Sequence, residues 1–307
     1  MGRRRKTKGE TMAQVKIYVA CHKTAPVPEH PFLVPLQVGA ALAGERFPGM
    51  IQDDTGDNIS GRNRSYCELT GLYWAWKNDC AQYQGLFHYR RYLSFASADF
   101  RRASSGPWGR PYRVLRRPDH RTLEKNGYFS QGLWDSLRQY DVIAPVPEEM
   151  HITVARHYAQ APHHHGRDLA LVCSVLQGGR PALYQAAQQY LSGTAHFFGN
   201  LCLMKRELFC GYCQWLFSVL EEYDRKKDVT GYTAQALRVD GYLAERLLGA
   251  YLLYLKREGA SLAFLPRLHF AGMEAPGPYY KKRAETILLP PGTARRSAAK
   301  RLLRKHL

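Results

Sequence analysis

The sequence predicts an α/β fold with a mostly parallel central sheet flanked by helices on both faces. Short apolar runs typical of strands alternate with longer segments whose apolar residues recur at helical spacing. Hydrophobic residues make up 45% of the 307 residues, which is typical of a packed globular protein. The sequence has no evident internal repeat and no clear linker. We therefore expect one folded domain over residues 12–290.

In the first half of the chain, strands are expected at residues 15–20 and 33–38, where the apolar pattern is strand-like. Loop 52–60 is rich in turn-forming residues. One amphipathic helix is expected over 65–78, and the strand that follows it ends at His88. Ligands of open α/β sheets bind at the carboxyl ends of strands, so the residues after this strand are candidates for a binding site.

Residues 94–127 are rich in Arg, Ser, Gly and Pro and lack a clear period. A long segment of this kind predicts an irregular, mobile excursion over or beside the site. The rest of the chain predicts a regular alternation of helices and strands. Helices are expected over 133–139, 152–162, 166–177, 181–191, 205–223 and 238–256, and strands over 140–145, 196–204 and 262–264.

The net charge of +18 is concentrated in three segments of the chain. Residues 1–11 carry +4, residues 97–127 carry +5 and residues 281–307 carry +8, so the rest of the chain is close to neutral. A nucleic-acid-binding protein would need basic residues along a folded groove. The distribution of charge therefore argues against nucleic acid as a partner.

Both ends of the chain are basic. Residues 1–11 predict a flexible leader, or a misassigned start ahead of Met12. Residues 291–307 predict a basic amphipathic tail, in which 295–307 form a helix that can lie on anionic lipid headgroups; a solvated tail is the alternative. No apolar run reaches the ~20 residues needed to cross a bilayer. We expect a cytoplasmic protein that could be peripheral on the inner face of the plasma membrane.

The seven cysteines are scattered and odd in number, which fits a reducing compartment better than a disulfide framework. Cys210 and Cys213 lie in a stretch with helical apolar spacing, and no second Cys/His pair stands at zinc-finger distance from them. We therefore expect no metal bound by these cysteines.

The most informative motif is the run Gly85–Tyr92, with the sequence GLFHYRRY. Here an apolar strand ends in a histidine, two arginines and two tyrosines. Guanidiniums bind phosphate bidentately and stay charged at any relevant pH. The motif predicts an anion site built from His88, Arg90 and Arg91.

Several motifs, spread over about residues 15–255, resemble the DUF4422 family. They lie at residues 16–23, 37–40, 53–60, 66–78, 85–92, 140–145, 199–200, 204–205, 212–217 and 241–248. Members of this family are associated with bacterial capsule, exopolysaccharide and O-antigen gene clusters, and they resemble glycosyltransferases of GT-A-like fold. Some are assigned as galactofuranosyltransferases. The resemblance implies a GT-A-like domain that transfers galactose or galactofuranose from a UDP-linked donor to a surface polysaccharide or a lipid-linked glycan.

Many GT-A enzymes bind the donor diphosphate through a divalent metal on an Asp-X-Asp motif, which this sequence lacks. We expect His88, Arg90 and Arg91 to bind the diphosphate instead, so that no cofactor is needed. A requirement for Mn²⁺ or Mg²⁺ is one alternative. Pairing of the arginines with carboxylates across the sheet is another.

Polar residues in two further places are candidates for binding the nucleotide. Carboxylates on loop 52–60 could bind ribose hydroxyls, uracil or a metal, although loop carboxylates more often cap a helix or a turn. Residues after the first strand could line the same pocket. The predicted nucleotide-binding residues are Cys21, His22, Lys23, Asp53, Asp54, Asp57 and Asn58.

Transfer with inversion requires a carboxylate that takes the proton from the acceptor hydroxyl. Glu245 is the first candidate, because it is polar within a leucine-rich helix, and Asp240 is the second. The alternative for Glu245 is an ion pair with an arginine on a helix face. Tyr89, His196 and Asn200 are candidates for binding the sugar or the acceptor, with a core position as the alternative for His196.

A second functional class fits the same polar residues. A phosphohydrolase or nucleotidyltransferase acting on an anionic substrate could use His88, Arg90 and the carboxylates of residues 53–57. Nucleic-acid binding is a third and less favoured class, because the charge lies outside the predicted folded body.

Overall fold

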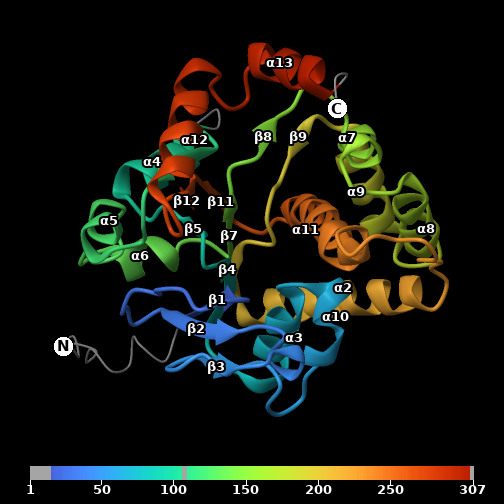
Figure 1. The fold of residues 1–307 in the computed structure, drawn as a ribbon, viewed down its shortest axis with the longest axis horizontal. Helices are drawn as coiled ribbons and strands as arrows, with labels where there is room; N and C mark the ends of the chain where they lie inside the picture. The colour runs from blue at the N-terminus through green and yellow to red at the C-terminus, as the bar shows by residue number, and fades with distance from the viewer. Residues whose placement is uncertain (1–14, 106–108, 305–307) are drawn as a thin grey trace.

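A ten-stranded mixed sheet forms the centre of the protein (Figure 1). The structure is a computed structural model that describes residues 15–105 and 109–304. Along the main path of the sheet, every strand is parallel to the others except β10, which is antiparallel to both of its neighbours. In spatial order these strands are β3 (Ile51–Gln52), β2 (Leu33–Gln37), β1 (Val15–Cys21), β4 (Tyr83–His88), β10 (Cys202–Lys205), β7 (Val142–Pro145) and β11 (Leu262–Leu265). The predicted α/β class is confirmed.

A smaller group of strands branches from the carboxyl end of β4. There the chain turns back and pairs through His88 and Arg91 alone. The branch consists of β5 (Arg91–Leu93), β12 (Arg267–Phe270) and β6 (Tyr112–Leu115), with β12 antiparallel to β5 and parallel to β6. Nearby, β8 (Glu148–Glu149) and β9 (Ala195–His196) form a separate two-stranded ribbon. The turn after β4 therefore connects the main sheet to the branch.

Helices cover both faces of the sheet, as predicted, because successive side chains of a strand point to opposite faces. In β1, Val15, Ile17 and Val19 pack into one core, whereas Tyr18 and Ala20 pack into the other. Figure 1 shows the two groups of helices on opposite sides of the sheet. The first core also contains α4 (Ser97–Ser105), α5 (His120–Lys125) and α6 (Leu133–Leu137). The second contains α2 (Asn63–Tyr66), α3 (Leu69–Asn78), α7 (Val154–Gln160), α8 (Gly166–Gln177), α9 (Pro181–Ser192), α10 (Arg206–Asp224) and α11 (Val239–Arg257).

The expectation of an irregular segment at residues 94–127 is wrong, because this stretch contains α4, β6 and α5. A buried polar network holds it together. The Arg113 guanidinium donates to both carboxylate oxygens of Asp99, at 2.6 and 2.7 Å, and also to Ser94 and Asn126. Long-range pairing of this kind leaves no periodic signal in the sequence, and a composition rich in Arg, Ser, Gly and Pro is also typical of loops.

Two predicted elements are interrupted. The helix expected at 65–78 is divided into α2 and α3 at Cys67, whose φ of 52° is unusual for a residue other than glycine. The strand expected at 196–204 is divided into β9 and β10 by a turn with Gly199 at φ 76°. Both interruptions lie beside the cavity described below, and neither is visible as a break in the apolar pattern.

Two helices at the end of the chain pack over the branch of the sheet, α12 (Pro276–Leu288) and α13 (Ala294–Arg304). The predicted tail forms the helix α13 over Ala294–Arg304, and one of its basic residues, Arg296, is buried and donates to Tyr112. The predicted leader at residues 1–11 lies outside the described residues. Within the described ranges, every helix is too short or too polar to span a bilayer.

Gly85 provides a test of the pairing between β4 and β10. A methyl group there would lie 2.3 Å from the carbonyl oxygen of Cys202 and 3.0 Å from Cα of Leu203, both on the neighbouring backbone. We expect Gly85→Ala to lower the free energy of unfolding by about 1–3 kcal/mol or more, measured by urea denaturation. Gly61→Ala is the matched control, since its methyl group would meet nothing within 4 Å. Equal stability of the two variants would contradict this register.

Candidate active site

A large cavity, here called the main cavity, opens at the carboxyl ends of β1, β2 and β4. It has a volume of about 840 Å³. Ala20, His22, Val38 and His88 line it from the ends of these strands. The opposite wall comes from α2 and from the first two turns of α11. Its place matches the expectation that ligands of an α/β sheet bind beyond the carboxyl ends of parallel strands.

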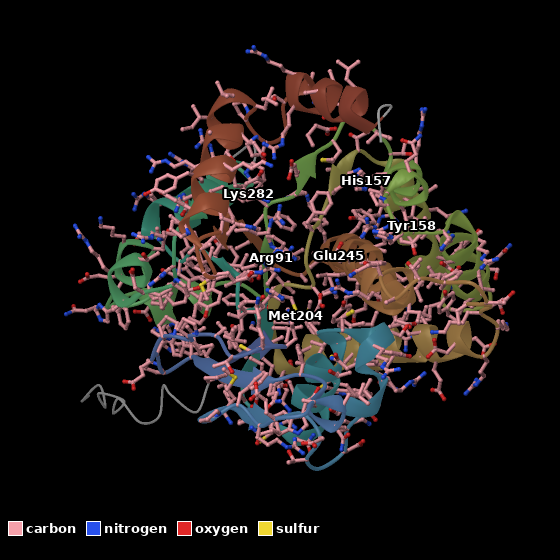
Figure 2. All side chains as sticks on the ribbon, viewed as in Figure 1. Arg91, His157, Tyr158, Met204, Glu245 and Lys282 are labelled. Atoms are coloured by element: carbon pink, nitrogen blue, oxygen red, sulfur yellow. The ribbon has the colours of Figure 1, made fainter. Side chains whose placement is uncertain are left out.

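The turn between β4 and β5 brings Arg90 and Arg91 to the main cavity. Arg90 also lies 3.7 Å from the carboxylate of Glu274, so the predicted alternative of a carboxylate partner holds in part for this residue. Arg91 lies near the centre of the molecule in Figure 2, close to the turn at Gly199. Within the described residues, Arg91 has no ion pair with a carboxylate.

Two histidines of the main cavity, His88 and His22, are neutral at physiological pH. Burial lowers the pKa of His88 well below its usual value, and Arg91 and Arg90 lower it further. Burial and then Lys23 lower the pKa of His22 as well. Nδ1 of His88 accepts from the Arg90 backbone N–H at 3.2 Å, so Nε2 carries the proton of the neutral ring and can donate it to a ligand.

The beginning of α11 adds positive charge that the sequence analysis did not anticipate. Arg238 precedes the helix and lines the cavity together with Gly241 and Tyr242 of the first turn. The Arg238 guanidinium donates to the sulfur of Cys67 at 3.3 Å. The positive end of the α11 dipole favours anions at this position.

Glu68 forms part of the wall of the main cavity because the helix is interrupted at Cys67. Its Oε1 accepts from the side-chain amide of Asn200 at 2.8 Å, and the same amide nitrogen lies 3.3 Å from the carbonyl oxygen of Gly241. Asn200 is buried behind the wall. The predicted sugar ligand Asn200 is therefore placed to orient Glu68 rather than to line the cavity.

Glu245, labelled in Figure 2, comes from α11 and lines the main cavity. One carboxylate oxygen accepts from the backbone N–H of Gly199 at 2.8 Å, and the other lies 2.7 Å from Nη1 of Arg246. The predicted alternative, an arginine partner, is thus present, yet the carboxylate still borders the cavity. Among the residues that line it, five arginines face two glutamates: Arg64, Arg90, Arg91, Arg238 and Arg246 against Glu68 and Glu245.

The second candidate for the catalytic base, Asp240, lies outside the main cavity. Its side chain is fully buried, accepts from the Ser65 hydroxyl and lies 2.9 Å from the Lys227 ammonium. Burial and then the neighbouring Asp224 raise the pKa of Asp240 to about 6. Because protein groups enclose this carboxylate, it has no access to an acceptor hydroxyl.

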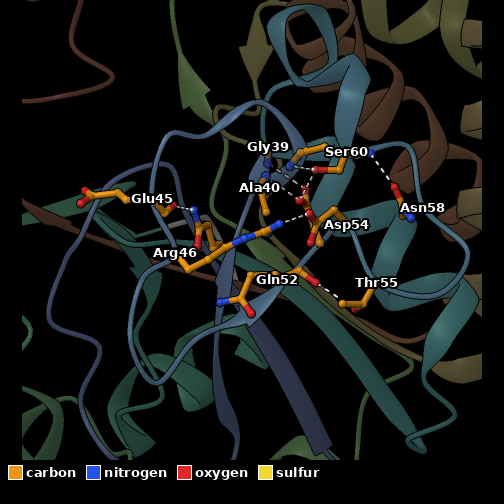
Figure 3. A network of polar contacts seen from close by, with 12 residues as sticks. Gly39, Ala40, Glu45, Arg46, Gln52, Asp54, Thr55, Asn58 and Ser60 are labelled. Atoms are coloured by element: carbon orange, nitrogen blue, oxygen red, sulfur yellow. Dashed lines mark hydrogen bonds and ion pairs between the residues drawn. The ribbon is translucent and has the colours of Figure 1, made fainter.

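The carboxylates of loop 52–60 build a turn instead of a nucleotide pocket. Asp53 is fully buried, and its two oxygens accept from the backbone N–H groups of Gly39 and Ala40, each at 2.9 Å. The Ser60 hydroxyl donates to the same carboxylate. Figure 3 shows how Gly39, Ala40 and Ser60 converge in this network. Asp53 therefore fixes the backbone that follows Val38. Val38 itself lines the main cavity.

The neighbouring predicted ligands also have structural partners. Asp54 lies 2.6 Å from Nη2 of Arg46, and this hydrogen bond lowers the pKa of the carboxyl. Asp57 accepts from the Tyr73 hydroxyl at 3.1 Å. Asn58 donates to Gly56 and accepts from the Ser60 backbone. None of these side chains lines the main cavity.

Of the three residues after the first strand, only His22 lines the cavity. Cys21 is buried, and this burial raises the pKa of its thiol to about 12. Lys23 pairs with the carboxylate of Glu274, which it shares with Arg90. The predicted nucleotide-binding roles of Cys21 and Lys23 therefore have no direct support from the geometry.

Two further candidates are buried beside the cavity. Tyr89 packs edge-on against the His22 ring, with 5.2 Å between the ring centroids. Nε2 of His196 lies 2.9 Å from the carbonyl oxygen of Ile152. Burial lowers the pKa of His196 to about 4, so the ring is a neutral core side chain, as the alternative reading of the sequence held.

Divalent metal was tested against the donor set that the chain offers. Across residues 15–105 and 109–304, no three His, Cys, Asp or Glu side chains are grouped so that they could hold a metal ion. The described residues therefore do not fit the divalent-metal site that many GT-A enzymes have.

Most of the residues that the sequence analysis missed share the main cavity with those it found. Several lie in α2, in the interruption after it and around the start of α11, where basic residues next to an apolar pattern resemble ordinary solvated positions; His157 comes from α7, and His164 and Phe198 come from loops. The unusual backbone at Cys67 and the turn at Gly199 place them together, and neither leaves a local signal. The missed lining residues are Asn63, Arg64, Glu68, His157, His164, Phe198, Arg238, Tyr242 and Arg246.

The chain belongs to the family described as "Domain of unknown function (DUF4422)", which it matches over residues 16–257. No curated protein matches it significantly. Its fold is similar to a solved structure described as the apo form of the bifunctional glycosyltransferase WbbM, with a TM-score of 0.77 and 28% sequence identity. The similarity covers 86% of this chain and 46% of the WbbM chain, so this chain spans about half the length of that protein. The predicted family is confirmed.

Replacing Asp53 distinguishes the structural role from nucleotide binding. Asp53→Ala removes the acceptor of two buried backbone N–H groups, and we expect it to lower the free energy of unfolding by about 1–3 kcal/mol in urea denaturation. Asp57→Ala is the control, because the Asp57 carboxylate is exposed, and we expect unchanged stability and unchanged UDP affinity. If Asp53→Ala were fully stable and lost only nucleotide affinity, the structural assignment would be wrong.

Proposed function

We propose that this DUF4422 protein is a glycosyltransferase that takes a sugar from a nucleotide-diphosphate donor in the main cavity. The observation that carries the proposal is the excess of guanidiniums over carboxylates at the carboxyl ends of β1 and β4. A bound diphosphate would compensate this charge through bidentate hydrogen bonds. The similarity to half of a bifunctional glycosyltransferase supports the same class of reaction.

The donor diphosphate is assigned to Arg90, Arg91 and Arg238. Arg90 and Arg91 extend from the turn after β4, and Arg238 stands across the cavity at the start of α11. His88 and His22, neutral at physiological pH, can add hydrogen bonds without adding charge. The proposed donor is UDP-linked galactose or galactofuranose, a choice that rests on the family resemblance. The proposed acceptor is a bacterial surface polysaccharide or a lipid-linked glycan.

The transfer needs a group that removes a proton from the acceptor. In the proposed reaction, the acceptor hydroxyl loses its proton to the Glu245 carboxylate while its oxygen bonds to the anomeric carbon. The bond from that carbon to the diphosphate oxygen breaks, and the nucleoside diphosphate leaves with the electron pair. The guanidiniums near the diphosphate stabilise the charge that develops on it.

The competing proposal of a phosphohydrolase or nucleotidyltransferase has less support. It used His88 and Arg90 together with the carboxylates of residues 53–57, and these carboxylates do not line the main cavity. Hydrolysis of the donor at a rate independent of any acceptor glycan would favour that class over transfer.

The metal-independent binding of the donor is tested by calorimetric titration of UDP-, GDP- and CMP-sugars in the presence of EDTA and of Mn²⁺. We expect a UDP-sugar to bind with the same Kd under both conditions. Arg91→Ala should weaken binding by roughly 10-fold to 100-fold, since a charge-assisted hydrogen bond contributes about 1.5–3 kcal/mol. Arg101→Ala, on the exposed surface of α4, is the control. Strict dependence on Mn²⁺ or Mg²⁺ would contradict the proposal.

The catalytic base is tested by comparing the two carboxylates of the main cavity. Glu245→Gln keeps the shape of the side chain but removes its capacity to accept a proton, so kcat should fall by about 10²-fold to 10⁴-fold while the Kd of the UDP-sugar stays unchanged. Glu68→Gln is the matched variant, because Glu68 borders the same cavity and should retain the larger part of kcat. The opposite ranking of the two variants would transfer the role to Glu68.

A location at the inner face of the plasma membrane is part of the proposal. It is supported by α13, which ends the described chain and carries Leu302 with 62% of its surface exposed. Such a helix could contact anionic lipid without any membrane-spanning segment.

A further inference from the structure

A second cavity adjoins the main cavity and is lined chiefly by basic side chains. It has a volume of about 210 Å³ and lies between the strand branch and the two last helices. Arg91 and Arg267 come from β5 and β12, Lys282 comes from α12, and Arg296 comes from α13. Glu148 of β8 is the one carboxylate among its described lining residues.

The positive charge in this cavity is incompletely compensated. Glu148 lies 3.6 Å from Nη2 of Arg267 and 3.9 Å from Nε of Arg296, which are longer than hydrogen bonds. Oε1 of Glu148 and the Nε atoms of both arginines are buried without a hydrogen-bond partner among the described residues. The two arginines are only 8% and 9% exposed. Buried charged groups with unused hydrogen-bonding atoms are costly unless a ligand completes them.

Burial and the positive charge of this cavity shift the pKa values of the titratable groups in it. Burial and then Arg91 lower the pKa of Arg267 to about 10, so the guanidinium remains charged at neutral pH. Burial, followed by Lys282 and Arg91, lowers the pKa of His269 to about 3, so this imidazole is neutral. The side chains that line the cavity therefore include three arginines and a lysine but a single described carboxylate, that of Glu148, a composition that suits a multiply charged anion better than a monocarboxylate.

The second cavity is connected to the main cavity through shared residues. Arg91 and Phe198 line both cavities. In Figure 2, Arg91 lies between Glu245 on one side and Lys282 on the other. An anion in the second cavity would therefore lie beside the site assigned to the donor diphosphate and the proposed base, where the acceptor has to enter.

The helices that close the second cavity also expose apolar side chains. On α12 and α13 these are Tyr280, Ile287, Leu288 and Leu302, with exposed fractions of 61%, 66%, 70% and 62%. Exposed apolar side chains on the helices that close a basic cavity are complementary to a phosphate ester that carries a hydrocarbon chain.

We propose that the second cavity binds the phosphate or diphosphate group of a lipid-linked acceptor. The assignment of the ligand as an acceptor rests on the proposed glycosyltransferase function. Arg91, Arg267, Lys282 and Arg296 hold the phosphoryl oxygens, and the hydrocarbon chain lies against the exposed side chains of α12 and α13. The binding of a phosphoryl group by these residues stands on the geometry alone.

The anion site is tested by calorimetric titration of inorganic pyrophosphate into the full-length protein saturated with UDP. One pyrophosphate per chain should bind, and Lys282→Ala should weaken its Kd by roughly 10-fold to 100-fold. Lys281→Ala is the matched control, because it removes the same charge from an exposed position of α12 outside the cavity. Thermal unfolding of both variants checks that the fold is kept. Absence of a Lys282-dependent site, or an equal loss in both variants, would overturn the proposal.

The same titration separates the anion site from the proposed function. If UDP did not occupy the main cavity, two pyrophosphate sites would appear, and Lys282→Ala would weaken only one of them. Farnesyl diphosphate then distinguishes a lipid-linked source from free diphosphate. We expect it to bind at least as tightly as pyrophosphate with the same loss in Lys282→Ala. Binding of pyrophosphate without binding of farnesyl diphosphate would overturn the assignment to a lipid-linked acceptor.

Discussion

The reversal of the chain between His88 and Arg91 is the constraint on which both cavities depend. β4 is buried between β1 and β10, so its carboxyl end has a fixed position in the sheet. The chain leaves that end as β5, paired through one residue on each strand, and thereby starts the branch that contains β12 and β6. Arg90 and Arg91 lie on a turn whose two sides are anchored in different parts of the sheet. This anchoring limits the freedom of their side chains, so less conformational entropy is lost when an anion binds.

Positive charge without enough carboxylate partners destabilises the protein until an anion binds. In the main cavity five arginines face two glutamates, and in the second cavity Glu148 lies beyond hydrogen-bond distance of both arginines it faces. A ligand that binds only the folded state stabilises that state, by about 2.7 kcal/mol when the ligand concentration is 100 times its Kd. By contrast, Asp99 and Arg113 form a complete bidentate pair away from the cavities. The incomplete pairs therefore indicate candidate anion-binding positions more clearly than charge alone does.

The sequence predicted the elements whose packing repeats along the chain, and it failed where distant residues decide the structure. The alternation in β1 and the helical spacing in α10 and α11 specify buried faces locally. The Arg90 and Arg91 motif was identified because charge directly after an apolar strand has few structural uses. The sequence left two roles open for Asp53, because a loop carboxylate looks the same whether it accepts from a ligand or from Gly39 and Ala40, and the structure shows the second set of partners. Arg238 and Glu68 were not predicted as site residues, because their positions in the wall of the main cavity depend on the unusual backbone at Cys67.

The position of Arg91 between the two cavities bears on how guanidiniums could replace a metal in the proposed reaction. A sugar-linked diphosphate becomes a free nucleoside diphosphate as the bond to the anomeric carbon breaks, so negative charge grows next to this residue during the reaction. An interaction that strengthens as charge develops lowers the barrier more than it lowers the energy of the bound substrate. Anions in both cavities would repel each other, and the shared guanidinium, with five N–H donors, can offset that repulsion by bonding to both. Arg91 would then favour the state in which donor and acceptor are bound together, which is the state that reacts.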